Sequence, residues 1–205
     1  MREIAGEAGA ISSVAGPLGA ALRAAAPRAG RTRVLAIDGR SGAGKTSLAT
    51  ALSGELGAPV VSLEDLYGGW DGLEDGIDLL VREVLEPLAA GRAPRVPRYD
   101  WAARRWAEPV PLDPPELLIA EGAGAGACRA AAFASLLVWL EAPPSVRKKR
   151  ALDRDGEVFA PHWDQWAAQE DALLARERTP ERADVVIDGV RGEVTLRRWR
   201  RCRTP

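Results

Sequence analysis

Five short apolar runs are spaced along the chain, and each has about the length of a β-strand. They cover residues 33–38, 59–63, 117–121, 135–140 and 184–188. The runs at 117–121 and 135–140 are apolar without alternation, which is typical of strands buried on both faces of a parallel sheet. We therefore expect a mainly parallel sheet of about five strands.

Segments with helical spacing separate these runs. Residues 45–56 follow the first run with helical spacing, and Gly57 is a plausible end of this helix. The apolar residues at 77–88 share one helical face, and Pro87 should end or bend this second helix. Prolines open a basic helix at 143–154 and a later helix from 161, whose tryptophans we expect on the core. The alternation of strands and helices predicts an α/β fold.

Three further segments complete the organisation. Residues 91–115 carry six prolines and no regular pattern, but Tyr99, Trp101 and Trp106 argue against disorder, so we interpret this segment as a functional loop. Residues 16–26 predict a short surface helix. We divide the chain into an N-terminal helical extension (1–30), one domain (31–190) and a basic C-terminal tail (191–205).

The bulk composition excludes several classes of protein. The 205 residues suit one domain, and the net charge of -1 provides no positive field for nucleic acid or an anionic membrane. Glu3 and Glu7 stand where a signal peptide would be basic, and no apolar stretch approaches the ~20 residues of a membrane span. We expect a cytoplasmic protein that acts on a small molecule, with a homo-oligomer left open.

The two cysteines, Cys128 and Cys202, lie far apart in the sequence and form no CxxC pair. His162 is the single histidine, so a zinc site of cysteine and histidine ligands is implausible. We therefore expect two free thiols, as in a reducing compartment.

A glycine-rich segment carries the most specific motif. Residues 39–46 match the pattern G-x-x-x-x-G-K-[ST] between a strand and a helix. Glycines let backbone N–H groups approach phosphate oxygens, and the helix adds the positive end of its dipole. The residues that we expect to bind the nucleotide are Gly39, Arg40, Ser41, Gly42, Ala43, Gly44, Lys45, Thr46 and Ser47.

The lysine of this motif supports the same interpretation. Lys45 can reach the β- and γ-phosphates of ATP, and the Thr46 hydroxyl can bind Mg²⁺. Only three of the 28 basic residues are lysines, and one of them occupies this position. A compact ammonium suits a phosphate loop in a way that a planar guanidinium does not. ATP and Mg²⁺ are therefore the expected cofactors, and the preference for ATP over GTP stays open.

From about residue 34 to residue 188, the chain resembles the uridine kinase and phosphoribulokinase branch of the P-loop kinases. The glycine-rich motif carries most of the resemblance, and shorter segments follow in the family's order. The resemblance implies a three-layer α/β/α P-loop kinase fold with a helical lid at about 144–161. It also implies transfer of the γ-phosphate of ATP to a hydroxyl group of a small acceptor.

Two acidic positions match those of the family. The segment Glu64-Asp65-Leu66-Tyr67 resembles the one whose first carboxylate acts as the base on the acceptor hydroxyl, although Glu64 stands where the family usually has Asp. Glu64 or Asp65 can take this role, and helix capping is the alternative. The Ala120-Glu121-Gly122 segment resembles the family's Glu-Gly, which implies that Glu121 orients Mg²⁺ through water.

The acceptor residues follow from a weaker resemblance. The Val-Pro-Arg-Tyr-Asp-Trp segment resembles one that contacts the nucleoside in uridine kinases, which implies that Tyr99 and Trp101 bind the acceptor. Packing beneath a long loop is the alternative. Arg104 stands where the family has a histidine, which favours an anionic or unrelated acceptor. Tyr67 and Asp71 are further acceptor-binding candidates, and Asp71 could instead cap a helix.

Three arginines share one face of the basic helix, since Arg147, Arg150 and Arg154 have i, i+3, i+7 spacing. With Asp155 they resemble the family's lid. The resemblance implies that Arg147 binds the nucleotide and that Arg150 and Arg154 stabilise the transferring phosphoryl group. A solvated basic face is the alternative, because two lysines lie beside them.

These features together predict an ATP-dependent small-molecule kinase that phosphorylates a hydroxyl group of a nucleoside-like or other acceptor. Arg104 and Arg105 leave a nucleoside monophosphate kinase open. A regulatory P-loop ATPase that acts through a protein partner is the other alternative. A GTP switch is unsupported, because no Asn-Lys-x-Asp segment occurs.

Overall fold

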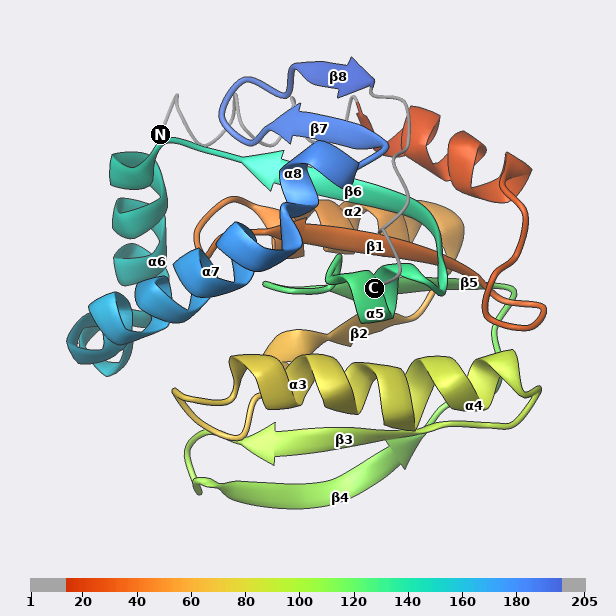
Figure 1. The fold of residues 1–205 in the computed structure, drawn as a ribbon, viewed down its shortest axis with the longest axis horizontal. Helices are drawn as coiled ribbons and strands as arrows, with labels where there is room; N and C mark the ends of the chain where they lie inside the picture. The colour runs from red at the N-terminus through yellow and green to blue at the C-terminus, as the bar shows by residue number, and fades with distance from the viewer. Residues whose placement is uncertain (1–13, 197–205) are drawn as a thin grey trace.

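The computed structural model describes residues 14–196 of the chain, and its centre is a six-stranded sheet. The strand order is β2-β5-β1-β6-β7-β8, which runs from bottom to top in Figure 1. The strands are β1 (Arg33–Gly39), β2 (Val60–Ser62), β5 (Leu117–Glu121), β6 (Ala134–Glu141), β7 (Val185–Asp188) and β8 (Val194–Leu196). All neighbouring pairs are parallel except β7 and β8. The expected mainly parallel α/β fold is confirmed, with β8 as an additional strand from the predicted tail.

The helices connect and cover these strands. They are α2 (Lys45–Leu56), α3 (Leu73–Leu79), α4 (Glu86–Ala89), α5 (Cys128–Ala131), α6 (Pro144–Phe159), α7 (Trp163–Glu177) and α8 (Thr179–Arg182), and residues 14–24 form a further helix. Short 3₁₀ turns cover Leu63–Asp65 and Ala160–His162. Within residues 14–196, no helix is both long enough and apolar enough to cross a bilayer.

The central strands bury both faces, as their continuous apolar sequences indicate. Val34 and Leu118 lie in a core with α3, α4 and α7, whereas Leu35, Ile37 and Ile119 lie in a second core with α2 and the 14–24 helix. Strand residues alternate between faces, so neighbouring apolar residues enter different cores. The result is a sheet between two helical layers.

The N-terminal helix is part of this packing. Val14, Leu18 and Leu22 are buried in the second core, and Leu22 has no exposed surface. The sequence predicted a surface helix at 16–26; the structure shows a helix at 14–24 with one buried face.

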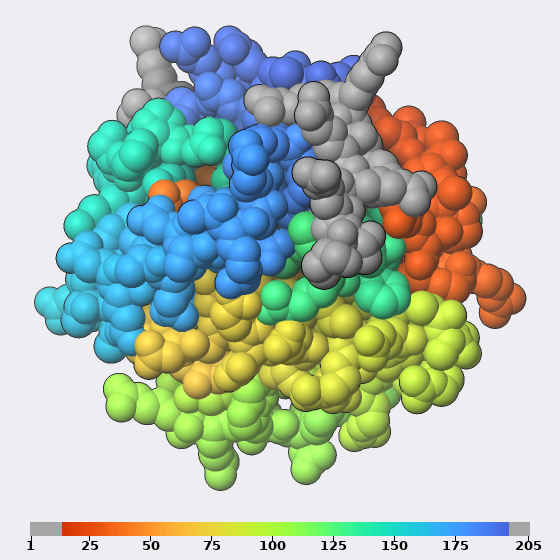
Figure 2. Space-filling view, in the orientation of Figure 1, coloured from red at the N-terminus to blue at the C-terminus, as the bar shows by residue number. Residues whose placement is uncertain are grey.

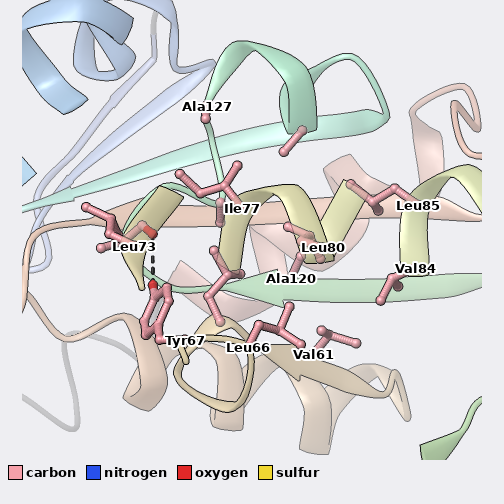
Figure 3. Packing of buried hydrophobic residues seen from close by; sticks show 14 of the residues in the cluster. Val61, Leu66, Tyr67, Leu73, Ile77, Leu80, Val84, Leu85, Ala120 and Ala127 are labelled. Carbon is pink, nitrogen blue, oxygen red and sulfur yellow. Dashed lines mark hydrogen bonds between the residues drawn. The ribbon is translucent and has the colours of Figure 1, made fainter. Parts of the chain in front are cut away.

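The helix predicted at 77–88 begins earlier and changes its winding. α3 continues into a π-helical stretch at Leu80–Leu85 and then into α4. Pro87 lacks an N–H and would clash with the carbonyl of residue 83 in a regular α-helix, and the wider turns before it avoid this. The helical winding continues past Leu85 rather than ending, and Leu73, Ile77 and Leu80 lie in one core cluster with Ala120 of β5 (Figure 3).

Much of the segment predicted as an irregular loop is an antiparallel hairpin. β3 (Arg95–Asp100) pairs with β4 (Arg105–Pro111) in a separate two-stranded sheet. Prolines are tolerated because each strand has an open edge and the pairing shifts register between Val96 and Arg98. Figure 2 shows the hairpin, in light green, along one side of the molecule below α3.

Cys128, at the start of α5, is disulfide-bonded, so the expected free thiol is wrong at this residue. A disulfide requires two cysteines whose Cα atoms lie within about 7 Å of each other. The number of residues between two cysteines in the sequence does not reveal this distance. Cys202 lies outside the described residues.

Candidate active site

The predicted phosphate loop, residues 39–46, lies where three strands end. β1 ends at Gly39, β2 at Ser62 and β5 at Glu121, and Ser62 is paired with Glu121 in the sheet register. The carboxyl edge of a parallel sheet is the usual location of binding sites in such folds. The phosphate loop therefore meets the acidic residues that follow the other two strands.

The backbone of the phosphate loop requires glycine at two points. Gly42 has φ +79°, and a Cβ there would lie 2.1 Å from the backbone oxygen of Arg147. Gly44 has φ +105° and caps α2, whose first turn has no side-chain cap and no acidic residue. The first N–H groups of α2 thus have no side-chain acceptor and form a site for an anion. Lys45 spans the loop, with its Nζ donating to the Arg40 carbonyl at 3.2 Å.

A carboxylate from α7 holds the phosphate loop from the other side. Glu170 is buried, and its Oε1 accepts from the Ser41 N–H at 2.7 Å and from the Ser41 hydroxyl at 2.8 Å. The same oxygen accepts from Trp166 Nε1 at 3.0 Å, and Oε2 accepts from Arg40 Nε at 3.2 Å. Sequence reasoning missed Glu170, because its partners in the loop are about 130 positions away and no motif marks it.

Two of the three predicted lid arginines bind the phosphate loop through backbone carbonyls. Arg147 is buried and donates to the carbonyls of Ala142 and Ser41, and burial lowers its pKa. Arg150 donates to the carbonyls of Gly42 and Gly189 at 3.5 and 3.1 Å. In this structure both arginines support the loop from α6, and neither lines the cavity described below.

Glu121 and Thr46 lie together, as expected for a metal site. The Thr46 hydroxyl is 3.4 Å and 3.5 Å from the two carboxylate oxygens of Glu121, and the Ser62 hydroxyl donates to Glu121 at 2.8 Å. Burial raises the pKa of Glu121, against the effect of nearby Lys45. A buried carboxylate beside a hydroxyl provides the oxygen ligands that Mg²⁺ prefers.

The donor set also fits this ion in number. No group of three or more histidine, cysteine or acidic residues could hold a metal within the described chain. Mg²⁺ is usually held by one or two carboxylates together with phosphate oxygens and water. Thr46 and Glu121 provide oxygen atoms of the kind and number that such an ion takes from a protein.

A cavity of about 340 Å³ opens beside Lys45 and is called the site cavity below. It is lined by Ser41, Lys45, Glu64, Tyr67, Trp70, Trp101, Gly122, Ala123, Arg154, Asp155, Val158, Phe159 and Trp166. The structure thus brings Lys45 and Glu64 to one cavity together with Tyr67, Trp101 and Arg154. Asp65 does not line it.

Glu64 and Arg154 form an ion pair at the site cavity. Arg154 Nη2 lies 3.1 Å from Glu64 Oε1, and its guanidinium also donates to both oxygens of Asp155. The bonds to Asp155 raise the pKa of Arg154. α6 is broken just beyond this point, where Gly156 has φ +56° and ψ -136°, and Phe159 reaches the cavity from the segment after the break.

Aromatic rings form the rest of the wall. Trp70 stacks on Phe159 with ring centroids 5.2 Å apart and an angle of 9° between planes, and it also stacks on His162 at 4.5 Å. Trp101 packs against Trp70 at 4.7 Å. Sequence reasoning found Trp101 but missed Trp70 and Phe159, whose contact joins two distant segments.

The structure places three acceptor-binding candidates outside the site cavity lining. Tyr99 packs edge-to-face on Trp101 and Trp106 within the hairpin region. Arg104 is exposed in the hairpin turn with φ +52°. Asp71 accepts from Gln165 Nε2 at 2.6 Å, and α3 has no side-chain cap, so the capping alternative for Asp71 is not formed.

A third buried carboxylate, Asp38 at the end of β1, holds the loop whose residues Gly122 and Ala123 line the site cavity. Asp38 accepts from the backbone N–H groups of Gly39, Gly124 and Gly126 at 2.7 to 2.9 Å. Burial raises its pKa to about 6, although these N–H groups oppose the rise. The loop that Asp38 holds includes Ala123, whose carbonyl accepts from the Tyr67 hydroxyl (dashed in Figure 3).

Known proteins were found that share the fold of this chain, but none that matches its sequence. The chain matches no protein-family model and no curated protein sequence. Among solved structures, it is 24% identical to a protein from Bacillus stearothermophilus described as a possible uridine kinase, with a TM-score of 0.57, covering 77% of this chain and 89% of that one. The chain has the P-loop kinase fold. The predicted resemblance is thereby confirmed at the level of the fold.

Two further P-loop kinase structures agree. A D-glycerate 3-kinase from Cryptococcus neoformans is 11% identical, with a TM-score of 0.55, and the match covers 91% of this chain and 98% of that one. A protein proposed as a fructose transport system kinase from Silicibacter sp. TM1040 is 20% identical, with a TM-score of 0.55, covering 84% and 94%. Because these identities are low and the three descriptions differ in substrate, the P-loop kinase fold does not specify an acceptor.

Proposed function

We propose that this protein is an ATP-dependent kinase that transfers the γ-phosphate to a hydroxyl group of a small acceptor. The observation that carries the proposal is the shared site cavity, which places Lys45 of the phosphate loop and the Glu64 carboxylate around one space. A phosphoryl donor and a base that face the same cavity are the two requirements of such a transfer.

The phosphate end of the site has a clear division of roles. The first N–H groups of α2 and the Lys45 ammonium bind the phosphates, as the absence of a side-chain cap allows. Thr46 and Glu121 would hold Mg²⁺, which supplies positive charge to the phosphate oxygens when bound. Arg147 and Arg150 donate hydrogen bonds to backbone carbonyls of the phosphate loop. They therefore support nucleotide binding indirectly, by holding the backbone of this loop.

The chemical step assigns the proton to Glu64. The acceptor oxygen forms a bond to the γ-phosphorus, and the bond from that phosphorus to the β–γ bridging oxygen breaks, so ADP leaves with the electron pair. The hydroxyl proton passes to the Glu64 carboxylate. Arg154, at 3.1 Å from Glu64, stabilises charge on the transferring group. Most of the acceleration comes from positioning and electrostatics.

The two alternative functions gain no support from the site. Arg104 and Arg105, which favoured a nucleoside monophosphate kinase, are exposed on the hairpin and do not line the site cavity. A regulatory ATPase does not require the cavity of about 340 Å³ that joins Glu64 to the phosphate loop, whereas a small-molecule kinase does. The small-molecule kinase is therefore the function that we propose.

The decisive experiment is a phosphotransfer screen of hydroxyl compounds with wild-type protein and Lys45→Ala. We expect transfer by the wild type and a loss of at least about 100-fold in the variant, because Lys45 stabilises the phosphates in the transition state. Lys149→Ala is the matched control, since Lys149 is exposed and pairs with Asp153. Full activity of Lys45→Ala would refute the assignment.

A further inference from the structure

The aromatic wall of the site cavity offers few hydrogen-bonding groups. Tyr67 donates its hydroxyl to the Ala123 carbonyl at 2.8 Å, and Trp101 donates its Nε1–H to the Glu64 carbonyl at 2.9 Å. Trp166 donates its Nε1–H to Glu170 at 3.0 Å. Each donor is used within the protein, so what these three residues can offer a ligand is ring surface, and Tyr67 and Trp166 offer little of it because they are buried.

The cationic groups that line the cavity are engaged within the protein. Lys45 belongs to the phosphate loop, and the Arg154 guanidinium is bound by both oxygens of Asp155 and by Glu64. In the sequence, Arg104 favoured an anionic or unrelated acceptor, but this residue lies in the hairpin turn, outside the cavity lining. Lys45 is thus assigned to the phosphates and Arg154 is held by Asp155 and Glu64, which leaves neither side chain for an acidic acceptor.

The shape of the cavity matches this chemistry. Its volume of about 340 Å³ is near the lower limit for small-molecule sites. Trp70 and Phe159 stack on each other, with 9° between their planes, and Trp101 packs against Trp70 at a tilt of 54°. A flat ring can contact such walls, whereas each additional hydroxyl or carbonyl group of a ligand would lose water and find few partners that are not already hydrogen-bonded within the protein.

We propose that the acceptor is an uncharged alcohol with a flat, largely apolar ring system and a single hydroxyl group that reaches Glu64. This inference rests on the proposed kinase function, and it excludes polyhydroxylated nucleosides and sugar acids as preferred acceptors. The ring system lies among Trp70, Trp101, Phe159 and Trp166, and the hydroxyl group is directed at the phosphate end.

The first test measures binding without nucleotide, by calorimetry, for 2-naphthalenemethanol, uridine and D-glycerate. We expect saturable binding of 2-naphthalenemethanol that is at least about tenfold tighter than that of either polar compound, because ring burial supplies the free energy. Equal or tighter binding of uridine or D-glycerate overturns the inference, and so does the absence of saturable binding by 2-naphthalenemethanol.

A matched pair of variants locates the binding. Val158 lines the site cavity and is 70% exposed, so Val158→Asp adds a charge at the aromatic wall without disturbing a buried position. We expect it to weaken 2-naphthalenemethanol binding about fivefold or more. Val194→Asp, the same substitution at an exposed position in β8, should change nothing. Equal affinity in the wild type and Val158→Asp overturns the inference.

These experiments distinguish failure of the proposed kinase function from failure of the proposed acceptor class. If 2-naphthalenemethanol binds as expected but ATP consumption and a phosphorylated product never appear with any bound alcohol, the kinase function falls while the ligand preference of the cavity stands. If uridine or D-glycerate is phosphorylated and also binds more tightly, the kinase function stands and the apolar acceptor is rejected.

Discussion

At the scale of single residues, the two adjacent carboxylates after β2 have different surroundings. Glu64 lines the site cavity and pairs with Arg154, whereas Asp65 does not line it. For the proposed transfer, the side chain that shares a cavity with the phosphate loop is the better placed of the two to take a proton from an acceptor. The sequence alone could not make this choice, because both residues fit the family's acidic segment.

We predict that Glu64→Gln lowers kcat by about 100-fold to 10,000-fold, the usual contribution of a general base. Asp65→Asn should lower it by less than about threefold, since Asp65 does not reach the cavity. Steady-state kinetics with an accepted alcohol measure both values, and ATP binding to Glu64→Gln should remain close to that of the wild type. Equal mild losses in the two variants would remove the base from Glu64.

Asp38 gives a prediction for stability. Burial raises its folded-state pKa to about 6 from 3.8, so the folded protein binds the proton more strongly than the unfolded chain. The contribution of Asp38 is fully present below pH 3.8 and is lost as pH rises through about 6. We expect the free energy of unfolding of the wild type, relative to Asp38→Asn, to fall by roughly 2 to 3 kcal/mol over this range.

Urea unfolding of both proteins between pH 4 and pH 7 measures this difference. Asn does not titrate, so other ionisable groups contribute equally to the two proteins and cancel. A difference that stays flat with pH would show that Asp38 keeps an ordinary pKa in the fold, with its three N–H donors offsetting its burial.

At this scale, the sequence could reveal functional residues only where they belong to a local sequence pattern. Residues 39–46 were found because their chemistry is contiguous, and Glu121 because it ends an apolar strand. Asp38 is part of a strand and Glu170 of an ordinary amphipathic helix. Their hydrogen bonds reach backbone groups about 86 and 129 positions away, and no local pattern encodes such contacts.

At the scale of elements, α7 and the phosphate loop act as one unit through Glu170. The carboxylate joins Ser41 and Arg40 of the loop to Trp166, whose ring lines the site cavity. A change in this carboxylate alters both the loop and the cavity wall. Under the proposed kinase function, Glu170 would be a positioning residue for the nucleotide, since it contacts the loop and not the site of the reacting atoms.

We predict that Glu170→Gln raises the KM for ATP about tenfold with a smaller effect on kcat. The amide keeps the shape of the side chain but loses the charge that faces Arg40 and one of its acceptor oxygens. Asp171→Asn is the matched control, because Asp171 also pairs with Arg40, at 2.7 Å, but its side chain is 65% exposed. An equal effect of the two substitutions, measured by ATP titration, would mean that burial of Glu170 contributes nothing.

Element boundaries were predicted well where one pattern dominates. α2 and β5 occur at the predicted residues because glycine or polar residues bound a clear apolar pattern. The π-helical stretch before Pro87 and the β3–β4 hairpin were not predicted. In both segments, proline suggested that the regular structure would be interrupted. Packing of Leu80 in the core maintains the helix, and strand pairing with a register shift between Val96 and Arg98 maintains the hairpin.

At the scale of the whole molecule, the sheet follows from the sequence more directly than the relative placement of α6 and α7 does. Apolar strands that bury both faces require a helical layer on each side, whatever the details of packing. The position of α6 and α7 over the phosphate loop depends instead on the break at Gly156 and on buried polar contacts from Arg147 and Glu170. Such contacts have no periodic signature.

The helix at residues 14–24 belongs to this single folding unit, because Leu22 is completely buried in the core that contains α2 and the sheet. We predict that Leu22→Ala lowers the free energy of unfolding by about 2 to 5 kcal/mol, as expected for a buried leucine. Arg23→Ala, at an exposed position of the same helix, should stay within about 0.5 kcal/mol of the wild type. Chemical unfolding should show one cooperative transition for all three proteins. If Leu22→Ala were as stable as the wild type, the helix would be an extension that folds apart from the sheet, and its side chains would contribute nothing to the core.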